Sequence, residues 1–208
     1  MKVSLSSTIV PAAVCAPGVE STVMNAPRDA RQLLVRQLQG ACSGELAAGF
    51  AYRGHAASLP AGPDRDRIRE IEREEWHHRL LVLGLLRDLE EGPSRTREVV
   101  FWCIGKTIGL LCHIGGWFIP MYGAGRLERS NIVEYEVAAI HAADCGRTDM
   151  LDCILSMAEV EWEHERFFRE RLIGHRLLRV LPQWDAPPPK SAIRQAFSND
   201  VATEASVA

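Results

Sequence analysis

The chain has 208 residues, of which 47% are hydrophobic and 25% are charged, a balance typical of a folded globular protein with one domain. Its formal net charge of −3 lacks the basic excess that neutralises phosphates, so we expect no nucleic-acid partner. Its 6 cysteines include no C-x-x-C pair, which argues against a zinc ribbon and a disulfide scaffold and favours a reducing compartment.

The two ends of the chain differ in composition from the middle. Residues 1–26 hold one lysine and then weakly apolar residues interrupted by Ser, Thr and Pro, which predicts a flexible leader rather than a signal peptide. Residues 183–208 combine a proline run with small and polar residues and predict a disordered tail. We therefore expect one domain over 27–182 and a cytoplasmic protein.

The central region divides into segments of helical periodicity. Turn residues and prolines separate them, and no stretch alternates like a strand. The expected helices run from about 27 to 52, from 64 to the Gly92-Pro93 stop, from 97 to 120, from there to 145, and from 150 to 181. The sequence predicts an all-α protein.

The second expected helix carries two polar residues on an otherwise apolar stripe. Steps of three and four residues from 68 to 89 pass through apolar side chains and through Glu75 and His78. Burying a carboxylate and an imidazole costs several kcal/mol unless each finds a partner, which can be the other side chain or a metal ion. Glu74 and His77 fall on a charged path and are expected to face water.

The last expected helix repeats this pattern. Its apolar stripe from 150 to 168 is interrupted only by Glu161 and His164. The segment "VEWEH" at 160–164 aligns with "EEWHH" at 74–78, tryptophan on tryptophan. The match indicates an internal repeat of helix pairs.

The helix before each motif is then expected to match as well. The first helix has one charged residue on its inner stripe, Glu45, within "GELAA" at 44–48. The segment "YEVAA" at 135–139 aligns with it and places Glu136 opposite Glu45. Glu134, on a neighbouring stripe, is the alternative to Glu136.

Four helices are thus expected to direct six candidate ligands inward: Glu45, Glu75, His78, Glu136, Glu161 and His164. One Glu from each of two helices and a Glu-x-x-His from each of two others is the ligand set of ferritin-like di-iron or di-manganese bundles. Four carboxylates neutralise two divalent ions, and each imidazole caps one of them. We expect a ferritin-like four-helix bundle of two helix pairs that holds two Fe ions, with a di-manganese or mixed Mn/Fe pair as variants. Buried Glu/His pairs without metal are the alternative.

Within this superfamily the chain is most similar to the demethoxyubiquinone hydroxylases, the di-iron monooxygenases of ubiquinone biosynthesis. The resemblance covers roughly residues 30 to 172. It rests on the first-helix pattern, the Glu-x-x-His of the second helix and the final Glu-x-Glu-His: Gly44, Glu45, Ala48 and Tyr52; Glu75 and His78; Glu161, Glu163 and His164. It implies an enzyme that uses O₂ to hydroxylate a quinone-type substrate.

Residues 99–125 form a long apolar run in which Lys106 is the only charged residue. We expect an extra apolar helix between the two helix pairs. Lys106, His113, Pro120 and several glycines disfavour a membrane span. Core, homodimer interface and peripheral membrane contact stay open, and the resemblance implies a surface that meets lipid and substrate.

The expected function is that of a di-iron, O₂-activating oxidoreductase, a monooxygenase or hydroxylase acting on an apolar substrate. Tyr52 is the candidate catalytic residue, expected to hydrogen-bond a ligand or to carry electrons, and a core tyrosine with a satisfied hydroxyl is the alternative. An external reductase is needed, because the sequence has neither a Rossmann fingerprint nor a cysteine-ligated iron centre. The alternatives are a ferroxidase, a rubrerythrin-like peroxide or iron detoxification protein, and a non-catalytic helical binding protein. The expected location is cytoplasmic, with peripheral contact on the inner membrane face.

Overall fold

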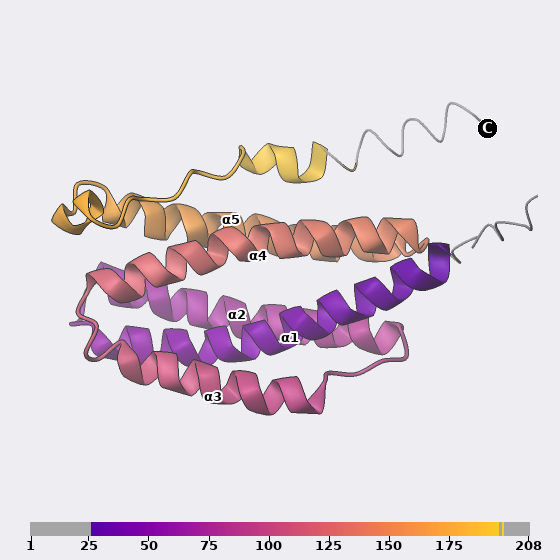
Figure 1. Ribbon diagram of the computed structural model, residues 1–208, viewed down its shortest axis with the longest axis horizontal. Helices are drawn as coiled ribbons and strands as arrows, with labels where there is room; N and C mark the ends of the chain where they lie inside the picture. Colours follow the sequence, from indigo (N-terminus) through magenta and orange to yellow (C-terminus); the bar gives the residue numbers. More distant parts are fainter. Residues whose placement is uncertain (1–25, 196, 198–208) are drawn as a thin grey trace, which may run out of the picture.

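The structure is a computed structural model that describes residues 26–195 and 197, and within these residues it is helical and contains no strand (Figure 1). The predicted all-α class is confirmed. The elements are α1 (Ala26–Ser58), α2 (Pro63–Asp88), α3 (Arg95–Leu111), α4 (Phe118–Asp144), η1 (Thr148–Met150), α5 (Leu151–Leu172) and η2 (Arg176–Arg179). The predicted leader lies outside the described residues except for its last residue, Ala26, which begins α1.

The long helices associate in two pairs. α1 packs along α2, α4 packs along α5, and α1 also contacts α4, while α3 lies on α1 (Figure 1). Two apolar clusters fill the interior. One contains Leu34, Leu38 and Ile154, and the other contains Ile71 and Phe168. Fully burying a side chain of this size contributes about 1.5–3 kcal/mol, so the clusters fix the helices on both sides of a central polar layer.

Glycines allow α1 and α3 to approach closely. We expected the first helix to end before Gly54, but α1 continues to Ser58. A Cβ on Gly54 would lie 2.3 Å from the Cα of Gly109 in α3, and a Cβ on Gly105 would lie 2.4 Å from the carbonyl oxygen of Ala47. Gly54 therefore permits a helix crossing rather than ending a helix.

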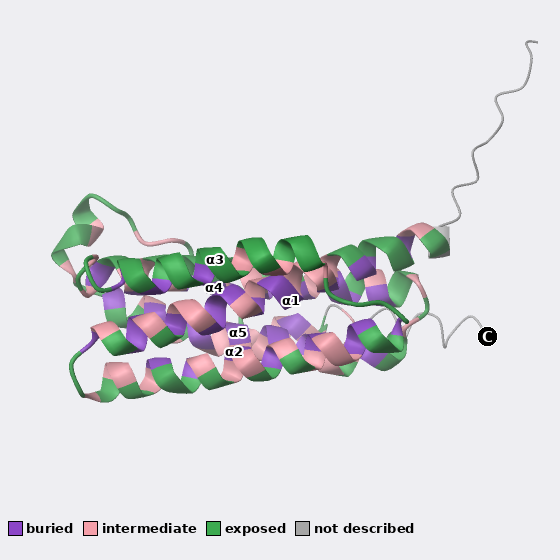
Figure 2. Cartoon of the chain, turned by 90° about the horizontal axis from the view of Figure 1, so that it is seen from below, coloured by how far each residue is buried: buried purple, intermediate pink, exposed green. Residues whose placement is uncertain are grey.

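The apolar run forms two helices instead of one. The third helix was expected to reach Pro120, but α3 ends at Leu111, and a turn with Gly116 at φ 65° leads into α4. Pro120 fits the first turn of α4, where a backbone N–H has no helical partner. The outer side of α3 is exposed (Figure 2), and its Val99 and Leu110 are 65% and 70% accessible. None of the described helices is both long and apolar enough to cross a membrane.

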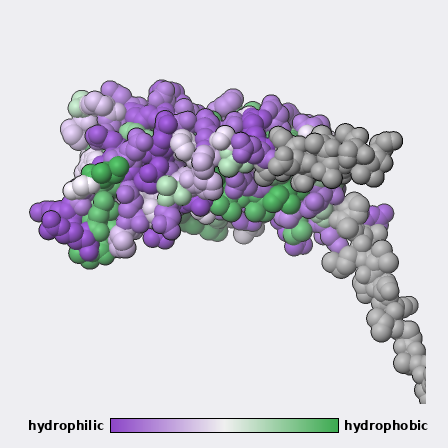
Figure 3. All heavy atoms as spheres, turned by 90° about the horizontal axis from the view of Figure 1, so that it is seen from above, coloured by the Kyte–Doolittle hydropathy of each residue, from purple (hydrophilic) through white to green (hydrophobic). Residues whose placement is uncertain are grey.

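The segment after α5 differs from the prediction. The last helix was expected to reach residue 181 but ends at Leu172. The expected disordered tail is wrong for residues 183–195, which lie against α5. Trp162 Nε1 donates to the Pro188 carbonyl at 2.9 Å, Arg194 pairs with Glu159 at 2.8 Å, and Ile193 is 3% exposed. The face of the molecule that carries this segment, seen from above in Figure 3, is largely hydrophilic. The rest of the predicted tail, apart from residue 197, lies outside the described residues.

Candidate metal centre

A layer of acidic and imidazole side chains lies in the middle of the four long helices, between the two apolar clusters. Each member is at most 3% exposed. The six residues are Glu45 from α1, Glu75 and His78 from α2, Glu128 from α4, and Glu161 and His164 from α5. Each is polar on an inward stripe that is otherwise apolar, so the packing that forms the core also buries these groups.

These residues form two overlapping groups that could each hold a metal ion. In each group, one ligand atom per residue lies within 4.8 Å of the others. The first group is Glu45, Glu75, His78 and Glu161, and the second is Glu75, Glu128, Glu161 and His164. Glu75 and Glu161 belong to both, so each group has one carboxylate and one imidazole of its own and two shared carboxylates.

Both imidazoles present Nδ1 to the shared carboxylates. His78 Nδ1 lies 2.9 Å from Glu161 Oε1. His164 Nδ1 lies 3.2 Å from Glu75 Oε1 and 3.3 Å from Glu161 Oε2. The same ring nitrogen of each histidine therefore faces the space between the four carboxylates.

Two buried tyrosines cross between the helix pairs. Tyr52 of α1 donates its hydroxyl hydrogen to Glu128 of α4, and Tyr135 of α4 donates to Glu45 of α1. Each tyrosine follows the glutamate of its own helix by seven residues (52 − 45 = 7 and 135 − 128 = 7). The two helices thus carry the same Glu-x₆-Tyr spacing. The tyrosine of each helix stabilises the carboxylate of the other helix that belongs to only one group, here called a terminal carboxylate. Tyr52 was expected to hydrogen-bond a metal ligand or to carry electrons; its partner here is Glu128 of the second group, and its catalytic role stays a prediction.

An outer carboxylate orients His164. Its Nε2 lies 2.7 Å from Glu74 Oε2, and Arg67 also binds that oxygen at 3.2 Å. This hydrogen bond lowers the pKa of Glu74. The prediction that Glu74 faces water is therefore wrong: it is half-buried and directs His164 Nδ1 inward, as outer carboxylates do for metal-binding histidines. His77 is exposed, as predicted.

Burial and mutual repulsion perturb the acid groups. The pKa values of Glu45 and Glu128 are raised well above their ordinary values, first by burial and then by the neighbouring carboxylates. Burial also acts against charge on Glu161, but the adjacent imidazoles of His164 and His78 hold its pKa well below the usual range. The neighbouring carboxylates, Glu161 above all, overcome the effect of burial and raise the pKa of both histidines. Glu45, Glu128 and both imidazoles thus hold protons more strongly than isolated groups of the same kind.

Several buried atoms of the cluster have no hydrogen-bond partner among the described residues. They are Glu45 Oε2, both carboxylate oxygens of Glu75, Glu161 Oε2 and His164 Nδ1. A buried polar atom without a partner costs about 1–3 kcal/mol. These are five of the eight buried side-chain atoms without a partner among the described residues, and carboxylate oxygens with imidazole nitrogens suit divalent transition metals. The residues present therefore fit bound metal ions.

On α4 the structure brings Glu128, and not the expected Glu136 or its alternative Glu134, into the groups that could hold a metal ion. Glu136 is half-buried and Glu134 is exposed, and neither belongs to the two groups. The inner stripe of α4 passes through Glu128, Ile132 and Tyr135. Glu136 follows Tyr135 directly and so lies about 100° away around the helix. The signal that could have identified Glu128 is the seven-residue spacing to Tyr135, which repeats the first helix.

Comparison with known proteins identifies no relative: no family model, no curated protein and no solved structure matches the chain.

Proposed function

We propose that the protein is a di-iron oxidoreductase of the ferritin-like type, in which α1, α2, α4 and α5 form the four-helix bundle around a dinuclear site. The observation that carries the proposal is the pair of overlapping groups sharing Glu75 and Glu161. Two cations a few ångströms apart repel each other, and carboxylates common to both offset that repulsion. Four carboxylates balance the charge of two divalent ions and exceed that of one.

Iron is the proposed metal because a set of four carboxylates and two imidazoles matches the di-iron and di-manganese proteins. Iron held there supplies the one-electron chemistry needed to react with dioxygen. The residues of the chain hold the metal-binding groups in position. Tyr52 and Tyr135 hold the terminal carboxylates, Glu74 fixes the ring of His164, and the apolar clusters keep bulk water away. Preorganised donors of this kind need little rearrangement when an ion enters.

We further propose that an apolar organic molecule, of the quinone type that the family resemblance implies, is oxidised with electrons from an external reductase. The exposed apolar side of α3, with Val99, Leu110 and Trp102, supports contact with an apolar partner or a membrane surface. Lys106 Nζ lies 4.2 Å from the ring centroid of Phe50, so the one charged group of residues 99–125 rests on an aromatic ring. Ferroxidase or peroxide-detoxifying activity is the rival function at the same metal site.

Metal analysis after anaerobic loading with Fe(II) tests the proposal. We expect about two ions per chain, as in the di-iron carboxylate bundles, and an absorption change on exposure to air. The double variant Glu75→Gln, His78→Gln should bind no iron, whereas Glu136→Gln should match the wild type. Circular dichroism checks that each variant is helical. A wild-type protein that binds no iron or manganese would refute the metal site.

The activities are separated by their products. Iron-loaded protein is supplied with a reductase, NADH and a short-chain quinol precursor, and the quinol products are analysed. A hydroxylated product supports the monooxygenase. Consumption of peroxide with unmodified quinol would refute it in favour of detoxification.

A further inference from the structure

A small cavity opens between α1 and α4 beside the first metal group. Its volume is about 40 Å³. Gly44, Glu45 and Ala48 line it from α1, and Leu127 and Tyr135 are among the α4 residues that line it. Leu127 is 46% exposed, whereas Glu45 and Tyr135 are 3% and 2% exposed. The cavity therefore joins the surface to a buried carboxylate of the candidate metal centre.

Small residues create this opening. Ala41, Gly44 and Ala48 stand one turn apart on the side of α1 that faces the cavity. A Cβ on Gly44 would meet no described atom within 4 Å, so the space beside it is empty rather than filled by a neighbour. Glu45 is one of the lining residues, and its Oε2 has no hydrogen-bond partner among the described residues. The opening thus borders a candidate ligand residue with an unpartnered oxygen.

The size of the cavity limits what can enter. A single water molecule needs about 10–15 Å³ of such volume, so the cavity of about 40 Å³ holds a molecule of two or three heavy atoms. Pockets for ring-sized organic ligands have volumes of about 300–1,000 Å³. Four of the lining residues are small or apolar, and the other four, Glu45, Asn131, Glu134 and Tyr135, are polar. The volume is too small for a cation with its shell of several water molecules, so the size of the cavity favours a small neutral molecule. The carboxylates of Glu45 and Glu134 are the features that would instead favour a cation.

We propose that this cavity, the α1–α4 slot, is the entry route for a water-sized neutral oxidant, dioxygen or hydrogen peroxide, and that its size excludes ring-sized substrates from this side of the metal centre. The reaction of the oxidant at the metal centre depends on the proposed function. The passage of a small molecule through the slot does not depend on it. An organic substrate must then approach from another side.

The first experiment follows passage in the metal-free protein. Dissolved dioxygen is paramagnetic and speeds relaxation of the nuclei that it approaches. With ¹³C-methyl alanine, we expect stronger relaxation at Ala41 and Ala48 than at Ala158, which is buried in the core away from the slot. Gly44→Leu should remove the difference. Equal relaxation at all three methyl groups in the wild type would overturn the proposal, even if no metal binds.

The second experiment uses protein loaded with Fe(II) and mixed with dioxygen or with peroxide. Gly44→Leu should slow oxidation by about tenfold or more at unchanged metal content. Gly44→Ala should have a smaller effect, and Leu127→Ala should speed the reaction by widening the mouth. Gly84→Leu is the matched control, because Gly84 is a half-buried glycine of α2 whose Cβ would meet only the Arg87 side chain, at 3.9 Å. The two oxidants are tested separately to show which one uses the slot.

Two results would overturn the proposal. One is a fully loaded Gly44→Leu protein that is oxidised at the wild-type rate. The other is slower metal uptake in Gly44→Leu and Glu134→Gln with unchanged oxidation of the loaded protein, which would make the slot a cation route. Failure of the wild-type protein to bind iron would instead refute the proposed function. The metal-free experiment would still show whether dioxygen enters the slot.

Discussion

Replacing Glu128 by Gln should remove one metal ion and leave the other. Glu128 belongs only to the second group, so its loss leaves that ion with His164 and the two carboxylates that are shared with the first ion. The first group keeps all four donors. Glutamine has nearly the same volume and can still accept the hydrogen bond from Tyr52, so the fold should persist. We expect about one ion per chain instead of two.

The loss of one metal ion in Glu128→Gln should also reduce how much metal stabilises the folded protein. An ion at a free concentration one hundred times its Kd stabilises the folded state by about 2.7 kcal/mol. For a chain of this length, each kcal/mol shifts Tm by about 2–4 °C. The Tm increase produced by metal should therefore be about 5–10 °C smaller in Glu128→Gln than in the wild type.

The assay combines metal content by atomic emission with thermal unfolding in the presence and absence of Fe(II) or Mn(II). Glu136→Gln is the matched control, since that carboxylate lies on the same helix but outside both groups. The control should bind two ions. If Glu136→Gln lost an ion while Glu128→Gln retained both, our assignment of the α4 ligand would be wrong.

Three further predictions follow from the charges and the close contacts. Metal binding must displace protons from the terminal carboxylates and the imidazoles, whose pKa values are raised, so affinity should increase with pH and calorimetry in two buffers should detect proton release. Burial lowers the pKa of His55 from 6.5 to about 4, although Asp64 acts in the opposite direction. The unfolded chain takes up this proton first, so stability should fall by about 3 kcal/mol between pH 6.5 and 4. In His55→Leu, the free energy of unfolding measured in urea should not show this part of the fall. A variant with the same pH dependence as the wild type would contradict the assignment to His55. Gly54→Ala should destabilise the protein by about 2 kcal/mol or more through contact with Gly109, whereas Gly84→Ala should be neutral or stabilising.

The sequence was sufficient for five of the six residues in the two groups. Glu75, His78, Glu161 and His164 stand out because a charged or polar group on an apolar helical stripe requires a partner in the core. Glu45 stands out for the same reason. Residues three and four positions apart lie on the same face of a helix, so these inward positions can be identified from the sequence alone.

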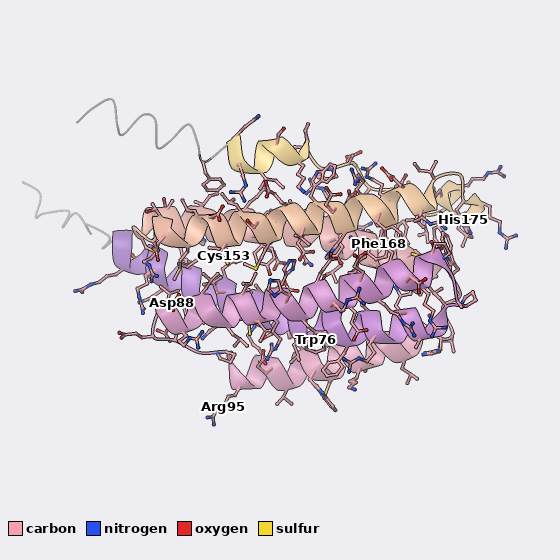
Figure 4. All side chains as sticks on the ribbon, turned by 180° about the vertical axis from the view of Figure 1, so that it is seen from behind. Trp76, Asp88, Arg95, Cys153, Phe168 and His175 are labelled. Carbon is pink, nitrogen blue, oxygen red and sulfur yellow. The ribbon has the colours of Figure 1, made fainter. Side chains whose placement is uncertain are left out.

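The remaining features depend on contacts between segments that are distant in the sequence. The α4 ligand was misplaced because the repeat was aligned through "GELAA" and "YEVAA" instead of through Glu-x₆-Tyr. Glu74 lies on the charged side of α2, and only the position of α5 brings His164 within its reach. The segment after α5 was misjudged because its Trp184 ring lies over Gly125 and packs against the apolar cluster that contains Phe168, which Figure 4 labels on α5. Composition does not reveal such a contact.

The division of the two metal groups between the helix pairs has a consequence for how the chain assembles. The α1–α2 pair contributes three of the four donors of the first group, and the α4–α5 pair contributes three of the four donors of the second. Each group obtains its fourth donor from the other helix pair. If the chain were cut between Gly115 and Gly116, neither fragment alone could complete a site, and full occupancy by metal would report that the two fragments had joined.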